Sequence, residues 1–114
     1  MAAALKNLAR MTTATTGTGT MTLGGAVAGF LSFAGAGIPD GATVSYGIKD
    51  TGASETGRGK YTASGTTLSR DTISESTNGG SAINLSGAAE VFVTALAEDF
   101  LEATLLAHAR LGGI

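Results

Sequence analysis

The chain has 114 residues and a formal net charge of −2, which suits one domain with a modest core. A slightly acidic chain lacks the basic surface that nucleic acids and anionic membranes attract, so we expect neither as a partner. The absence of Cys and the single His exclude a disulfide framework, a thiolate metal site and a multi-His site within one chain.

Few residues are charged (14%), while Gly, Ser, Thr and Ala dominate. A small monomer with so few charges would be poorly soluble, so we expect a surface covered by neighbours, as in a homo-oligomer. No apolar run is long enough to cross a bilayer, and the first ten residues lack the core of a secretory signal. We therefore expect a protein made in the cytoplasm and used without export by the general secretion route.

Residues 1–11 are predicted to form a short helical extension. Leu5 and Leu8 lie on the apolar side of its helical wheel, opposite Lys6 and Arg10. A helix this short is marginal alone, so it needs a surface to pack on. Leu5 and Leu8 are therefore candidate interface residues.

Residues 12–97 are predicted to form a β domain. Its first strand, within residues 11–23, alternates with Met21 and Leu23 on one side, and Gly24-Gly25 ends it. The next apolar group is Val27, Phe30, Leu31 and Phe33. We expect Val27, Phe30, Phe33, Phe92 and Leu96 to fill the interior, and residues 34–40 to form a loop.

Residues 41–72 are predicted to form a three-stranded antiparallel meander. Val44, Tyr46 and Ile48 alternate with polar residues, and turn chemistry at residues 50–53 and 63–65 reverses the chain twice. Gly57 and Gly59 share one face of the second strand. A Gly inside a strand marks a place where a backbone or ring comes close, and we expect Tyr46 or Tyr61 to lie across these two.

Further strands follow the loop at residues 75–81. One begins at Ile83, and the strongest candidate covers residues 90–96, with apolar residues on both faces. We therefore predict a mainly β fold: a small antiparallel β-sandwich or barrel of six to seven strands with short N- and C-terminal helices.

Residues 98–114 are predicted to form an amphipathic helix that begins near Glu98 or Asp99. Its apolar face is wide, Leu106 projects from the opposite side, and the sheet has its own residues for its interior. We therefore expect the helix to be an interface with another copy or with a larger protein. Its candidate interface residues are Phe100, Leu101, Leu105, Leu106, His108 and Leu111.

A catalytic constellation is nearly absent from the sequence. Asp50, Glu55, Asp71 and Glu75 occur near turns, but a glycosidase pair needs a cleft and aromatic residues, and the chain has no Trp and two Tyr. We interpret the four as solvated turn carboxylates. Residues 17–19 lack the Lys-Ser/Thr of a phosphate-binding loop. We expect no enzyme activity and no catalytic, cofactor-binding or metal-binding residues.

Residues 14–33, 40–50, 59–72 and 78–99 together resemble a module in virion proteins of tailed bacteriophages and prophages. YTASGTTLSRDT (61–72) is the most specific segment. The module occurs in fibre, spike, and head- or tail-associated structural proteins, and often continues into a longer fibre, whereas here an amphipathic helix follows. The resemblance implies a virion location and non-enzymatic partners such as capsid, spike, fibre or tail subunits.

The leading hypothesis is therefore a non-enzymatic structural subunit of a phage or phage-derived particle, such as a gene transfer agent. It would serve as a head decoration, spike-base or fibre/adaptor protein. The alternative is a carbohydrate-binding adhesin module that contacts a host-surface glycan, with Tyr46 and Tyr61 as its Tyr candidates. A polysaccharide-cleaving enzyme is the third hypothesis, and the missing aromatic lining disfavours it.

Overall fold

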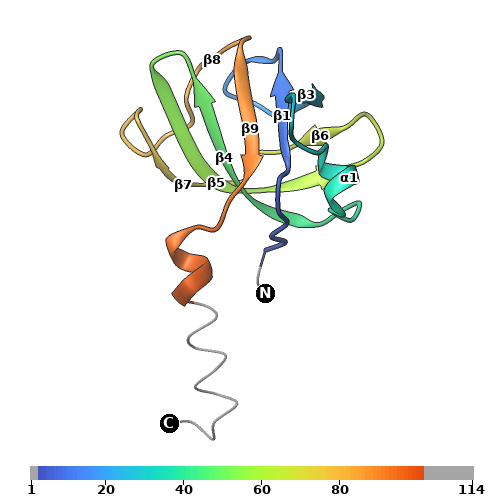
Figure 1. The fold of residues 1–114 in the computed structure, drawn as a ribbon. Helices are drawn as coiled ribbons and strands as arrows, with labels where there is room; N and C mark the ends of the chain where they lie inside the picture. The colour runs from blue at the N-terminus through green and yellow to red at the C-terminus, as the bar shows by residue number, and fades with distance from the viewer. Residues whose placement is uncertain (1–2, 102–114) are drawn as a thin grey trace, which may run out of the picture.

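The computed structural model describes residues 3–101 and shows a closed barrel of six antiparallel strands, one extra strand and two short helices (Figure 1). Around the barrel the order is β4 (Thr43–Asp50), β9 (Ala89–Val93), β1 (Arg10–Thr13), β3 (Met21–Ala26), β6 (Thr67–Leu68) and β5 (Ala53–Thr62), and β4 pairs with β5 to close it. β7 (Thr72–Ser76) extends the sheet beyond β5, while β2 (Thr16–Gly17) and β8 (Leu85–Ser86) pair separately. The predicted mainly β fold is confirmed, and it is a barrel.

The β4–β5 hairpin is the longest pairing in the barrel, from Thr43↔Lys60 to Asp50↔Ala53. Its two-residue turn contains Gly52 with φ 69°, a left-handed conformation that glycine adopts at little cost. The predicted third strand of the meander is divided. Its first part is β6, and after a break the chain pairs again with β5 as β7.

Gly57 and Gly59 allow the chain between β6 and β7 to run directly against β5. A Cβ added to Gly59 would lie 1.7 Å from the carbonyl oxygen of Ser69, and one on Gly57 would lie 2.2 Å from that of Thr72. The predicted close approach is confirmed, but backbone makes most of it, since only the Tyr46 hydroxyl also comes near Gly57. This course of the chain brings Arg70 to the barrel.

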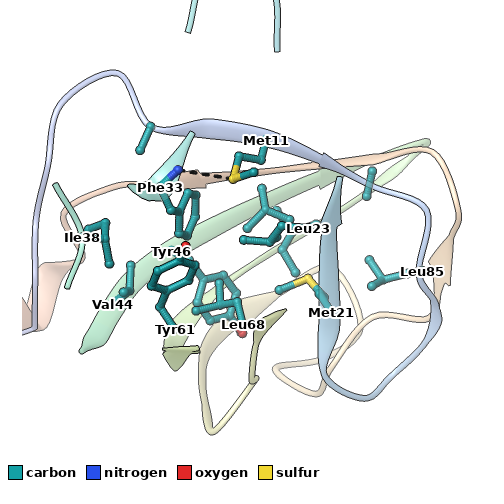
Figure 2. Packing of buried hydrophobic residues seen from close by; sticks show 14 of the residues in the cluster. Met11, Met21, Leu23, Phe33, Ile38, Val44, Tyr46, Tyr61, Leu68 and Leu85 are labelled. Carbon is teal, nitrogen blue, oxygen red and sulfur yellow. Dashed lines mark hydrogen bonds between the residues drawn. The ribbon is translucent and has the colours of Figure 1, made fainter. Parts of the chain in front are cut away.

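Side chains from the strands, from α1 and from the connecting loops fill the interior of the barrel (Figure 2). α1 (Phe33–Ala36) covers one end, where Phe33 packs on Tyr61 with ring centroids 5.8 Å apart and its N–H donates to the Met11 sulfur at 3.3 Å. The buried apolar cluster is Ala9, Met11, Met21, Leu23, Phe33, Ile38, Val44, Tyr46, Ile48, Tyr61, Leu68, Ile83, Leu85, Ala89 and Val91.

Two expectations about the first strands are wrong. The predicted single strand in residues 11–23 is divided among three strands: β1 and β3, which pair with each other, and the short β2 between them, which pairs with β8. Gly24-Gly25 does not end β3, because Gly24 provides the space that Thr12 needs: a Cβ there would lie 2.7 Å from the Thr12 hydroxyl oxygen. β3 therefore continues to Ala26.

The predicted interior set is only partly correct. Phe33 and Leu96 are buried, but Phe30 is 40% exposed and Val27 and Phe92 are half-buried. After β3 the chain turns, with the Phe30 N–H donating to the Val27 carbonyl at 2.8 Å, and this turn holds Phe30 outside the barrel.

The predicted helix in residues 1–11 is also wrong for the described part of that segment. Residues 3–9 are not helical, because their backbone groups bond to neighbouring segments. The Ala4 N–H donates to the Thr43 carbonyl at 2.7 Å, and the Leu31 N–H donates to the Leu8 carbonyl at 2.7 Å. These bonds replace a helix that would be marginal alone.

Residues 97–101 are helical, as predicted for the start of the C-terminal helix. The Asp99 carboxylate accepts the Leu96 N–H at 2.8 Å, which is one half of a capping box. The remainder of the predicted helix, residues 102–114, lies outside the described residues.

Candidate functional site

The exposed large hydrophobic side chains in residues 3–101 all belong to segments that emerge at one end of the barrel. The register Arg10↔Phe92 and Met11↔Ala26 places the start of β1 beside the ends of β9 and β3. The segments before β1, after β3 and after β9 therefore belong to this end, and Figure 1 shows the first and the last of them leaving the barrel at the bottom. Their exposed residues are Leu5 (45%), Leu8 (60%), Phe30 (40%), Leu31 (42%), Phe100 (66%) and Leu101 (65%). We call this the apolar end.

Leu8, Phe30 and Leu31 form the first part of the apolar end, which we call the Leu8 patch. Backbone hydrogen bonds join its two segments: Leu31 donates to Leu8, and Arg10 donates to Leu31 at 3.0 Å. Leu8 has φ 65°, a conformation that a branched residue adopts only at a cost. The fold therefore holds a leucine in a strained backbone and presents its side chain to solvent.

Arg10 borders the Leu8 patch and is held between two aromatic rings. Its guanidinium carbon lies 5.6 Å from the centre of the Phe30 ring and 4.9 Å from that of Phe92, and its Nε donates to Glu90 at 2.6 Å. Phe92 in turn covers Gly47, where an added Cβ would lie 2.5 Å from the ring. These contacts hold the Arg10 and Phe30 side chains in place along one side of the Leu8 patch without any bound partner.

Phe100 and Leu101 form the second part, which we call the helix surface. Two contacts fix the start of this helix on the barrel: Asp99 pairs with Arg58 of β5 at 2.5 Å, and Glu98 accepts a hydrogen bond from Ser74 of β7. Burial alone would raise the pKa of Asp99, but the hydrogen bonds from the Leu96 N–H and the Arg58 guanidinium outweigh it and lower that pKa. The helix therefore begins from a defined position.

A hollow of about 350 Å³ opens at the same end, between the N-terminal segment and the segment after β9. Its lining residues are Leu5, Lys6, Asn7, Val93, Thr94 and Ala95. It is large enough to receive a side chain from a partner, and Leu5 contributes apolar surface to it.

The opposite end of the barrel has a different character. Its turns and loops at residues 14–20, 51–52 and 77–82 are made of small and polar residues, and no exposed large hydrophobic residue lies there within the part of the chain that the structure describes. We call it the polar end. Within residues 3–101, the exposed large hydrophobic side chains thus lie at one end of the barrel and not at the other.

The prediction of solvated turn carboxylates is wrong for two of the four residues. Asp71 and Glu75 are exposed, but Asp50 and Glu55 are only 4% and 1% exposed. Asp50 accepts hydrogen bonds from the Ser86 N–H at 2.8 Å and the Ser86 hydroxyl at 2.6 Å. Its carboxylate thus attaches the loop at β8 to the end of β4.

Glu55 points into the barrel and meets three hydrogen-bond donors there. It pairs with Arg70 through both oxygens, and it accepts the Tyr46 hydroxyl at 2.6 Å and the Ile83 N–H at 2.9 Å. Burial alone would raise the pKa of Glu55, but the hydrogen bonds from Arg70, Tyr46 and Ile83 outweigh it and hold that pKa below its usual value. The same burial and the Glu55 charge raise the pKa of Tyr46.

This buried cluster was missed in the sequence, although one signal could have found it. Glu55 alternates with Gly57, Gly59 and Tyr61 on the inward face of β5, so the period alone places it inside. Nothing in the sequence indicates that Arg70 is the partner of Glu55. Arg70 reaches Glu55 because its segment runs directly against Gly57 and Gly59 of β5. Arg70 also donates to the carbonyls of Ile83 and Gly17 at 2.7 and 3.2 Å, and so joins loops of the polar end.

The predicted interface residues fall into two groups. Leu5, Leu8, Phe100 and Leu101 lie exposed at the apolar end. Leu105, Leu106, His108 and Leu111 lie outside the described residues. The Tyr candidates for a sugar-binding surface, Tyr46 and Tyr61, are only 0% and 2% exposed, so they offer no such surface.

Among residues 3–101 no group of three or more His, Asp or Glu side chains gathers as a metal site would require. In the same residues no helix has the length and apolar character to cross a membrane. Comparisons with protein-family models, curated proteins and solved structures find no match to this chain. Nothing in them links the chain to virion proteins, so the resemblance remains a prediction from the sequence.

Proposed function

We propose that this chain is a non-enzymatic structural subunit of a tailed-phage or phage-derived particle, and that it acts by protein–protein contacts through the apolar end. One observation carries the proposal: the exposed large hydrophobic residues of the described chain gather at one end of the barrel. Gathered apolar residues on a surface are typical of contact sites with other proteins.

Two further features support a structural role. Core side chains fill the interior of this barrel. Larger barrels can instead leave an internal cavity that holds a ligand. The inward carboxylate that could have served chemistry, Glu55, is held by Arg70 and Tyr46 away from solvent. The resemblance of four segments to virion modules indicates which role to expect, namely that of a head decoration, spike-base or fibre/adaptor protein.

The adhesin alternative has less support. Its Tyr candidates are buried, and two of the Phe residues, Phe30 and Phe92, already stack on Arg10. A glycan would have to displace these contacts to stack on either ring.

The test is incorporation into particles purified from the producing cells. A patch variant, Leu8→Asn with Leu31→Thr, removes apolar surface, and Asn tolerates the left-handed backbone at position 8. A control variant, Thr18→Ser with Thr51→Ser, changes exposed residues of the polar end. We expect the patch variant to be lost from particles and the control variant to be retained, with neither melting below the unaltered protein. Absence of the unaltered protein from particles would contradict the proposal.

A further inference from the structure

The loop after β7, residues 77–82, carries the one asparagine of the chain that is followed by glycine. This asparagine is Asn78, and the other two, Asn7 and Asn84, are each followed by leucine. All three are exposed. The loop runs outside the barrel between β7 and β8, at the left of Figure 1. Asn78 thus differs from the other two in its neighbour, Gly79, and not in being exposed.

The Ser76 hydroxyl holds the backbone on both sides of Gly79. Its oxygen accepts the N–H of Asn78 and the N–H of Gly80, each at 3.1 Å, and it donates to the Ser81 carbonyl at 2.5 Å. The Gly79 N–H lies between these two held groups and makes no hydrogen bond to any other residue in the range 3–101. Because Gly79 is also exposed, a base in solution can reach this amide and remove its proton.

One hydrogen bond holds the Asn78 side chain in the described structure. Its Nδ2 donates to the Ala82 carbonyl at 3.0 Å, across the same exposed loop. When this bond breaks, the side chain is free to turn its Cγ toward the Gly79 nitrogen. Gly79 has no side chain that would hinder this approach, and two groups held this close react as if at high concentration. The fold therefore slows a reaction between the two residues without preventing it.

We propose that Asn78 and Gly79 form a site at which the chain modifies itself, with conversion of Asn78 to aspartate or isoaspartate. The Gly79 nitrogen gives its proton to a base in solution and attacks the Asn78 Cγ. The new N–Cγ bond closes a succinimide ring, and the Cγ–Nδ2 bond breaks as Nδ2 takes up a proton and leaves as ammonia. Water then adds to one of the two ring carbonyls and opens the ring. The reaction consumes only water and needs no oxidant or reductant.

The product should alter the loop and leave the barrel intact. A carboxylate cannot donate to the Ala82 carbonyl, and isoaspartate also lengthens the backbone between residues 78 and 79. The loop ends at Ile83, whose N–H and carbonyl stay bound to Glu55 and Arg70 inside the barrel. Conversion therefore adds a negative charge to the polar end and loosens residues 77–82. This inference goes beyond the proposed function and does not depend on it.

The first experiment incubates the folded full chain in a mildly alkaline and in a mildly acidic buffer and locates the acidic products by tandem mass spectrometry. We expect conversion at Asn78 with release of ammonia, more of it in the alkaline buffer, and no measurable conversion at Asn7 or Asn84. Gly79→Ala and Asn78→Gln should both suppress it, because the first adds a methyl group beside the attacking nitrogen and the second requires a larger ring. An unchanged Asn78, or equal conversion at Asn7 and Asn84, would overturn the inference.

The second experiment tests the effect on the loop with Asn78→Asp, which has the charge of the product, and with Asn84→Asp as its matched control. We expect faster backbone hydrogen exchange in residues 77–82 of Asn78→Asp, a melting temperature close to that of the unaltered protein, and unchanged exchange in the same loop of Asn84→Asp. A loop that exchanges equally in Asn78→Asp and in the unaltered protein would overturn the predicted loosening.

Discussion

Arg70 and Glu55 form a two-point ion pair inside the barrel, with Nη2–Oε1 2.5 Å and Nε–Oε2 3.0 Å. Their side chains are only 1% and 0% exposed. Removing two charges from water is costly, and a buried pair is tolerated only when its remaining hydrogen-bonding groups are also satisfied. Tyr46 and the backbone at Ile83 complete the pair. The cluster therefore specifies where the loops of the polar end sit.

Removing Arg70 should strongly destabilise the domain. Arg70→Met leaves the Glu55 carboxylate buried without its counter-charge, and we expect a loss of about 3–5 kcal/mol in the free energy of unfolding. Denaturant titration measures it. The matched control is Arg10→Met, which breaks a partly exposed pair with Glu90 and should cost about 0–1 kcal/mol from the lost ion pair. Equal losses in the two variants would show that the buried cluster has no special role.

Stability should decline at both extremes of pH. The pKa values of Glu55, Asp50 and Asp99 are lowered in the fold, so their contribution is complete above the ordinary carboxyl range, roughly pH 4, and is lost as pH falls through the lower folded values. The pKa of Tyr46 is raised, so its contribution is complete below roughly pH 10 and is lost above it.

Urea midpoints measured across pH should therefore form a plateau with two declining sides. Tyr46→Phe removes the tyrosine whose pKa is raised. The variant should lose less stability at alkaline pH than the unaltered protein and should still lose stability at acid pH. An alkaline side that is unchanged in Tyr46→Phe would contradict the assignment to Tyr46.

Gly59 should not accept a side chain. In Gly59→Ala the new methyl group meets the Ser69 carbonyl, so β5 and the segment before β7 must separate. We expect a loss of at least about 1–3 kcal/mol, the usual cost of overpacking. Gly25→Ala is the control, because no atom lies within 4 Å of its added Cβ. A Gly59→Ala protein that melts like Gly25→Ala would refute the described close approach.

The β4–β5 hairpin and the mainly β class could be predicted because their signals are local, whereas the alternation alone left a sandwich and a barrel open. Val44, Tyr46 and Ile48 alternate along β4, and all three are buried. Arg70 and Phe30 could not be placed in this way. Arg70 reaches Glu55 only through contacts between distant segments, and Phe30 is excluded from the core by a turn that alternation does not reveal. The prediction of an N-terminal helix was wrong because the backbone of this segment hydrogen-bonds to Thr43 and Leu31. Such long-range pairing is not visible in the local pattern of apolar residues.

Leu8 should show opposite effects on stability and on association. Asn accepts a left-handed backbone better than Leu, so Leu8→Asn relieves strain of about 1–3 kcal/mol in part and should not lower the melting temperature. The same change removes an apolar side chain that is 60% exposed and should weaken association. Leu31→Thr, at a position without the positive φ, should weaken association without the gain in stability. A Leu8→Asn protein that associates as tightly as the unaltered chain would argue against the Leu8 patch as a contact surface.

The most direct test of the apolar end as the contact surface is backbone hydrogen exchange, compared between the isolated chain and the chain in its assembled state. Amides of residues 5–8, 28–31 and 97–101 should exchange more slowly after assembly, because the partner covers them. Amides in the turns at residues 51–52 and 78–80 of the polar end should exchange at the same rate in both states. Slower exchange at the polar end with no change at the apolar end would contradict the account.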